Sequence, residues 1–174
     1  MDITESLQTA QDLLNQWTSG MSTPDISRLD VTLAPKDLKP AVRILQKAHW
    51  GYLSAITGLD HPPLPVLPDD KQLAKEGTVE MLYHFCEGAA ILTLRVSVPY
   101  SRPVIPSICE ILPYASLYER EGIEMFGVTF RGTPNTEHFV LPEDWPNGVY
   151  PLRKSFTGFN KPAQSPTNPG LKSA

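Results

Sequence analysis

The sequence has few of the residues that hold a metal cluster. It contains only two cysteines, Cys86 and Cys109, and they form no C-x-x-C pair. Because zinc ribbons and iron–sulfur clusters need several closely spaced cysteines, we expect neither to be built from this chain alone. We interpret both residues as free core thiols. A disulfide between them is the alternative, which a reducing compartment would disfavour.

The sequence also lacks an excess of basic residues and any long apolar run. It has 15 Lys and Arg against 19 Asp and Glu, for a net charge of −4. This balance gives no electrostatic case for binding nucleic acid or an anionic membrane surface. No apolar run approaches the roughly 18 residues of a membrane-spanning helix, and the acidic start has no signal-peptide core. We expect a cytoplasmic protein that meets a membrane only through other proteins.

The sequence patterns of common enzyme classes are missing too. The chain has no G-x-G-x-x-G, P-loop or G-x-S-x-G pattern, which argues against dinucleotide-binding, NTP-binding and serine-hydrolase sites. A free-standing enzyme would have to use Glu121 or Glu124 together with His84 or His138. Lone histidines are more often surface or core residues than catalysts. We therefore predict no catalytic residue, no bound cofactor and no metal ligand.

The residues that are present predict one α+β domain. The chain has 174 residues, 41% of them hydrophobic, and a chain of this length buries about 70% of its unfolded surface. Apolar residues at helical spacing predict amphipathic helices over residues 2–18 and 38–48. Alternating apolar and polar residues predict strands: 30–34, 51–58, 79–85 and 92–98, the last two as a hairpin. We expect a small mixed or antiparallel sheet with helices packed on it.

Prolines set the organisation of the rest of the chain. The 18 prolines are about double ordinary usage, and they gather in a loop at 61–70 and in the C-terminal third. That third should be extended rather than helical. We divide the chain into an N-terminal helix and linker, the α+β domain, an extended interface arm and a flexible tail, at residues 1–27, 28–130, 131–156 and 157–174.

A helix predicted over residues 107–126, which Pro113 is expected to break early, does not read as an ordinary surface helix. At about 100° per residue its apolar side chains fall on two sides, so one side can pack on the sheet while the other needs a partner. One side carries Tyr114, Leu117, Tyr118 and Met125, and the other carries Ile123 and Phe126. Gly122 would permit close approach of another backbone, and Gly127 is placed to cap the helix.

Glu121 falls in the middle of the first apolar side. A carboxylate on an apolar face is costly unless it is hydrogen-bonded or paired. We interpret Glu121 as a structural carboxylate that fixes the fold or an interface, partnered by Arg120, Arg131, Arg153 or another protein. A catalytic carboxylate with a raised pKa is the alternative. Arg120 and Glu124 are four residues apart and are expected to pair.

The segment after this helix cannot form a core of its own. It combines turn residues and prolines with Trp145 and Arg153, residue types that commonly anchor interfaces. The segment must lie on a surface. Both its own domain and a neighbouring protein remain open as that surface.

Three blocks in this region together resemble one family. The run 119–132 (EREGIEMFGVTFRG), Leu141–Trp145 and Pro151–Phe156 match, in order and spacing, the C subunit of complex I (NADH:quinone oxidoreductase). The resemblance covers about residues 28–156. The interface and structural residues that it implies are Glu119, Arg120, Glu121, Glu124, Met125, Phe126, Gly127, Gly132, Pro142, Glu143, Asp144, Trp145, Pro151, Leu152, Arg153 and Lys154.

The resemblance implies a subunit without a redox centre, not catalytic alone, in the peripheral arm of a proton-translocating complex. Its partners would be the D subunit, which is related to the large subunit of nickel–iron hydrogenases, and the iron–sulfur subunits. Its place would be the cytoplasmic face of the membrane, and its role would be in assembly. The same subunit type occurs in energy-converting membrane hydrogenases and formate-hydrogenlyase-type complexes, which remain the alternative.

Overall fold

The computed structural model describes residues 2–63 and 76–159 and confirms the α+β fold. Its helices are α1 (Ile3–Leu14), α2 (Leu38–Lys47), α3 (Ala115–Phe126) and a short 3-10 helix, η1 (Pro35–Asp37). Its strands are β1 (Thr18–Asp25), β2 (Arg28–Leu33), β3 (Tyr52–His61), β4 (Thr78–Glu87), β5 (Ala90–Pro99), β6 (Val104–Pro106) and β7 (Thr129–Arg131). Most of the predicted proline-rich loop and of the predicted tail lies outside the described residues.

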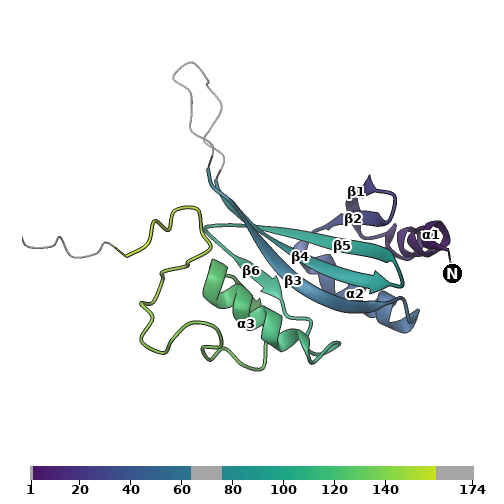
Figure 1. Ribbon diagram of the computed structural model, residues 1–174. Helices are drawn as coiled ribbons and strands as arrows, with labels where there is room; N and C mark the ends of the chain where they lie inside the picture. Colours follow the sequence, from purple (N-terminus) through teal and green to yellow (C-terminus); the bar gives the residue numbers. More distant parts are fainter. Residues whose placement is uncertain (1, 64–75, 160–174) are drawn as a thin grey trace, which may run out of the picture.

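The main sheet has five strands in the order β1-β2-β5-β4-β3 (Figure 1). Neighbouring strands are antiparallel except β2 and β5, which are parallel. The predicted hairpin is therefore confirmed as β4 and β5, and the sheet is mixed. Strands β6 and β7 form a separate parallel pair beside α3.

One face of the sheet is apolar and carries the core. On this face Val79, Met81, Tyr83 and Phe85 of β4 lie opposite Val98, Val96, Leu94 and Leu92 of β5. Buried residues of α1, α2 and α3 join these strand residues in a single hydrophobic cluster. Helix α1 packs on β2 and β5 and against α2, and α3 packs beside β3 (Figure 1).

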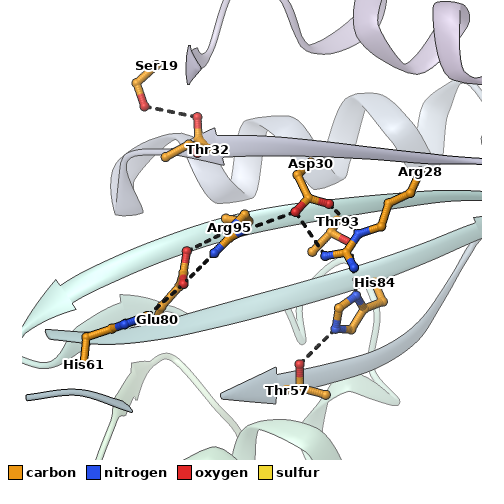
Figure 2. A network of polar contacts seen from close by, with 10 residues as sticks. All are labelled: Ser19, Arg28, Asp30, Thr32, Thr57, His61, Glu80, His84, Thr93 and Arg95. Carbon is orange, nitrogen blue, oxygen red and sulfur yellow. Dashed lines mark hydrogen bonds and ion pairs between the residues drawn. The ribbon is translucent and has the colours of Figure 1, made fainter. Parts of the chain in front are cut away.

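The opposite face carries a polar network with residues from β2, β5, β4 and β3 (Figure 2). Asp30 accepts hydrogen bonds from Arg28 at 2.6 Å and from Arg95 at 3.1 Å. Arg95 also binds Glu80 through two N–H groups, at 2.8 and 2.9 Å, and His61 lies 3.0 Å from the same carboxylate. The guanidinium of Arg95 holds the pKa of Glu80 below its usual range. These charges neutralise one another and connect β2, β5 and β4.

The predicted elements differ from the structure at the N-terminus. The helix predicted over residues 2–18 ends at Leu14, and the stretch expected to be a linker contains β1. Strand β1 lies at an edge of the sheet and most of its residues are exposed. An edge strand with polar residues on both faces lacks the alternation by which strands are recognised.

The predicted helix over residues 107–126 is shorter in the structure. It begins at Ala115, two residues after Pro113. A proline disfavours helical geometry in the residue before it, so the helix starts only after this position. Gly127 adopts the left-handed conformation, with φ of 68°, and its N–H bonds the carbonyl of Ile123 at 3.0 Å, which confirms the predicted cap.

Candidate functional site

Helix α3 presents its acidic residues differently from the prediction. Glu121, which the helix wheel placed in the middle of an apolar side, is exposed, and no described residue forms an ion pair with it. Glu119 is completely buried and Glu124 nearly so. The apolar side that carries Tyr114 and Leu117 faces outward instead, with about half of each side chain exposed.

Glu119 connects α3 to the segment that precedes it. One carboxylate oxygen accepts the Ile108 N–H at 2.8 Å, and the other lies 3.2 Å from the Cys109 sulfur. Burial raises the pKa of the Cys109 thiol, which keeps its S–H available as a donor. Burial, reinforced by the charge of Glu119, also raises the pKa of Tyr83 well above its usual range. Cys109 and the half-buried Cys86 are free thiols, as predicted.

Glu124 binds the arm through the arm's backbone. Its carboxylate accepts hydrogen bonds from the N–H groups of Phe139, Val140 at 2.8 Å and Leu141 at 3.0 Å. Burial raises the pKa of Glu124, but these three donors outweigh it and hold the pKa below its usual range. The imidazole of His138 lies 3.5 Å from the same carboxylate. Glu124 therefore acts as an anchor for residues 138–141.

Arg120 binds the same stretch of the arm from the preceding turn of α3. Its Nε donates to the carbonyl of Glu137 at 3.0 Å, and its Nη2 donates to the carbonyl of His138 at 2.8 Å. The guanidinium also lies 5.0 Å from the centre of the Phe139 ring. The expected pair between Arg120 and Glu124 is not formed, because each side chain binds the arm instead.

A second anchor holds the later part of the arm at Asp60, on β3. This buried carboxylate accepts the Lys154 backbone N–H at 2.8 Å and the Tyr100 hydroxyl at 2.5 Å. Arg153 lies 3.4 Å from Asp60, donates to the carbonyl of Phe126 at 2.7 Å, and stacks 4.3 Å from the Tyr100 ring. Arg153 and the arm around it therefore pack against their own domain.

Trp145 packs within the arm. Its indole N–H donates to the carbonyl of Val149 at 2.8 Å. Its ring centre lies 6.2 Å from that of Phe156 and 5.1 Å from that of Phe159. The other predicted interface residues divide by exposure. Met125 and Phe126 are buried, Gly127 and Pro151 are partly exposed, and Gly132, Pro142, Glu143, Asp144, Leu152 and Lys154 are exposed.

Gly122 has a different neighbour from the one predicted. A Cβ at this position would come within 2.9 Å of the Phe130 ring and 3.1 Å of the Met81 methyl group. The close approach is therefore to side chains of this chain and not to another backbone.

An exposed apolar surface accompanies the arm. We call it the α3–arm surface and define it by five large hydrophobic side chains, each 47–53% exposed: Tyr114, Leu117, Phe139, Val140 and Leu152. Leu117 and Glu121 are four residues apart and so share one side of α3. Glu121 and Leu152 line a hollow of about 280 Å³ between α3 and β3. The helix wheel identified Leu117 of α3 and Tyr114, the residue before the helix, whereas the arm residues gave no periodic signal.

The described residues hold neither a membrane-spanning helix nor a metal cluster. Residues 2–63 and 76–159 contain no helix long and apolar enough to cross a membrane. The same residues contain no group of three or more His, Cys, Asp and Glu side chains arranged to hold a metal ion.

Comparison with known proteins gives a family and a structural likeness. Residues 31–162 match the family described as the respiratory-chain NADH dehydrogenase 30 kDa subunit. The chain is 30% identical over 131 residues to the C subunit of the NADH-quinone oxidoreductase of Roseiflexus castenholzii, covering 72% of this chain and 68% of the relative. It is 42% identical over 67 residues to the membrane-bound hydrogenase subunit beta of Pyrococcus furiosus, covering 38% of this chain but only 39% of that relative.

The structural likeness is to Nqo5. A trypsin-resistant fragment of that protein, residues 1–134, superposes with a TM-score of 0.56 at 21% identity, covering 78% of this chain and 99% of the fragment. At this identity the likeness supports the fold alone.

Proposed function

The chain belongs to the family of the respiratory-chain NADH dehydrogenase 30 kDa subunit, and from this membership we propose that it is a cofactor-free, peripheral-arm subunit of a complex-I-like, proton-translocating NADH:quinone oxidoreductase. In this role it packs against the D subunit, which resembles a hydrogenase large subunit, and lies near the iron–sulfur subunits. It is needed for assembly and performs no catalysis alone. It lies on the cytoplasmic face of the membrane and contacts the membrane only through the complex.

The observation that carries this proposal is that the arm is held in place while its apolar residues in the α3–arm surface stay exposed. Glu124 and Asp60 use buried carboxylates to hold the backbone of the arm in one conformation. Phe139, Val140 and Leu152 of that arm nevertheless remain half exposed. Exposed apolar side chains that are held in place, and rimmed by polar groups, are typical of protein–protein contact sites.

The chemistry of Glu124 supports a structural role over a catalytic one. A general base must be free to accept a proton from a substrate. Both oxygens of Glu124 are instead occupied by backbone N–H donors, which lower its pKa. Glu121 is exposed on the surface of α3, where water solvates its carboxylate. A free-standing enzyme built on these carboxylates is therefore the weaker proposal.

The equivalent subunit of an energy-converting membrane hydrogenase or formate-hydrogenlyase-type complex is a second candidate. One observation favours it, namely the 42% identity over 67 residues to a membrane-bound hydrogenase subunit. The partners distinguish the two candidates. NADH- and flavin-binding subunits in the recovered complex would support complex I, whereas a nickel–iron hydrogenase large subunit that binds nickel would support the second candidate.

The test is recovery of the tagged chain from solubilised membranes, with its partners identified by mass spectrometry. We expect a large-subunit partner to be recovered with the wild type and at least tenfold less with Leu117→Asp, because a charge in a buried interface is costly. Ile26→Asp is the matched control, since Ile26 is 87% exposed and lies outside the α3–arm surface. Recovery of the wild-type chain alone would contradict the proposed function.

A further inference from the structure

A second hollow lies at the end of β5, away from the α3–arm surface. Its volume is about 360 Å³, within the lower range of pockets that take small ligands or a few side chains. None of the α3–arm surface residues lines it. The lining residues come from η1, from β5 and the turn after it, and from β6 and β7: Pro35, Lys36, Val98, Pro99, Arg102, Val104, Pro106 and Arg131.

The charged residues of this hollow are all of one sign. Lys36, Arg102 and Arg131 line it, and no carboxylate does. All three are exposed, and none forms an ion pair or a side-chain hydrogen bond with any residue the structure describes. Glu76 lies near the same turn, but its carboxylate binds the N–H and hydroxyl of Ser101 instead. Among residues 2–63 and 76–159, three cations without an ion-pair partner thus line one hollow of a chain whose net charge is −4.

The backbone that carries the two arginines is fixed. Arg102 donates its N–H to the carbonyl of Pro99 at 3.1 Å and accepts the N–H of Val104 at 2.8 Å. Arg131 pairs with Pro106 in the β6–β7 ladder, and its carbonyl accepts the Ser107 N–H at 2.9 Å. The hollow is thus formed before any ligand arrives, which lowers the entropy cost of binding.

The uncharged residues that line the hollow are apolar. Val98 is almost completely buried, Val104 is partly buried, and the others are prolines. Apolar residues beside charged groups are the composition of a protein interface with a polar rim. A ligand that fits the hollow presents at least one apolar side chain to these residues and carboxylates to the cations.

We infer that this hollow binds an acidic segment of a partner subunit. The two guanidinium groups suit carboxylates, which arginine binds through two parallel N–H groups. A lipid headgroup is disfavoured because membrane-binding elements project apolar side chains outward, whereas the apolar side chains here line a hollow. The inference rests on the proposed function, since it requires a complex in which β5 and β6 are covered by a partner.

The first test places a photo-activated cross-linking amino acid at residue 104 of the tagged, full-length chain in native membranes, because Val104 lines the hollow and its replacement keeps all three cations. We expect adducts with a partner-subunit peptide that contains several Asp or Glu residues. A lipid adduct, an adduct with a second copy of this chain, or no adduct would overturn the inference. The same cross-linker at residue 117 is the control. Adducts at 117 without the expected adduct at 104 would leave the proposed function standing, whereas loss of both would contradict it.

The second test is charge exchange. We expect Arg102→Glu or Arg131→Glu to reduce recovery of the partner identified by cross-linking about tenfold. This difference from the wild type should shrink as salt is raised, because salt screens exposed charge pairs. Lys47→Glu is the matched control, since Lys47 is exposed and lies outside the hollow. Reversing the identified acid of the partner to Lys should restore recovery with Arg102→Glu. Failure of this exchange, with the variant folded by circular dichroism, would overturn the inference.

Discussion

The carboxylate of Glu124, on α3, accepts a 2.8 Å hydrogen bond from the backbone N–H of Val140, 16 residues further along the chain. Arg120 binds the carbonyls of Glu137 and His138 from the same helix. One acidic and one basic side chain thus satisfy donors and acceptors of an arm segment that has no strand or helix of its own. The shape of the arm depends on charged side chains rather than on a hydrophobic core.

Replacement of Glu124 by Gln should loosen the arm without unfolding the domain. The amide keeps the shape of the carboxylate but removes the charge, and a hydrogen bond to a charged group contributes about 1.5–3 kcal/mol. Local opening of the arm should increase on the order of 10- to 100-fold. Hydrogen exchange of the Val140 and Leu141 amides measures this opening. Glu121→Gln is the control, and equal exchange in the two variants would contradict the anchor role of Glu124.

Stability should fall below neutral pH because of His84. Burial, and then the nearby charge of Arg28, lowers the pKa of His84. Its ring nitrogens lie 2.9 Å from the hydroxyl of Thr57 and 3.1 Å from that of Thr93 (Figure 2). Below about pH 6.5 the unfolded chain binds a proton at His84, whereas the folded protein binds that proton only at a lower pH. The free energy of unfolding therefore decreases from that pH until the lower pKa of the folded state is reached.

Urea denaturation at pH 7.5 and 5.5 measures this effect. We expect His84→Gln to lose less stability than the wild type between the two pH values. Both proteins contain the other histidines, so the difference between the two losses is the contribution of His84. An equal loss in both proteins would show that His84 does not titrate differently on folding.

Replacing Glu119 and replacing Glu121, two acidic residues of α3, should have very different effects on stability. Glu119→Ala leaves the buried Ile108 N–H without its acceptor and opens a space in the core. We expect a loss of about 2–4 kcal/mol in the free energy of unfolding, measured by chemical denaturation. Glu121→Ala removes an exposed side chain and should change stability by less than about 0.5 kcal/mol. A similar loss in both variants would contradict this assignment of burial.

The exposure of Glu121 shows what periodicity could and could not determine. The wheel correctly placed apolar residues on two sides of α3, and the structure leaves Tyr114 and Leu117 exposed. It gave no information on which side faces the sheet. That choice follows from contacts distant in sequence, such as those of Glu119 with Ile108 and of Gly122 with Phe130.

The sheet was predictable where its residues alternate and not elsewhere. Apolar residues recur at every second position over residues 79–85 of β4 and 92–98 of β5, so their pairing followed from the sequence. The exposed edge strand β1 and the three-residue strands β6 and β7 carry too little periodicity to be recognised. The hollow that Arg102 lines was therefore not predicted, because it forms between β5, β6 and β7.

The arm was recognised as a segment that must lie on a surface, but its anchors were not. Arg153 was identified as an anchoring residue type, whereas its partner Asp60 lies 93 residues earlier, in β3. Hydrogen bonds from a side chain to a distant backbone, as at Glu124, leave no pattern in a single sequence. Only the three-dimensional fold brings these groups together.

Two glycines with similar backbones should differ in their tolerance of alanine. Gly127 and Gly88 have φ of 68° and 57° respectively, a region that costs a non-glycine residue about 1–2 kcal/mol. A Cβ at Gly127 would overlap the ring of Tyr150, whereas a Cβ at Gly88 meets nothing within 4 Å. We expect Gly88→Ala to lower the free energy of unfolding by the backbone cost alone. Gly127→Ala should lower it by a further 1–3 kcal/mol or so, because the ring must move.

Chemical denaturation of both variants measures the difference, and Tyr150→Ala separates its causes. In the Tyr150→Ala background the ring is absent, so Gly127→Ala should cost about as much as Gly88→Ala does. If the excess cost at Gly127 persists without the ring, it arises from the helix cap and not from contact with the arm. If the excess cost disappears, it arises from the contact between Gly127 and the Tyr150 ring. This contact then holds the arm to the end of α3, in addition to the hydrogen bonds at Glu124 and Asp60.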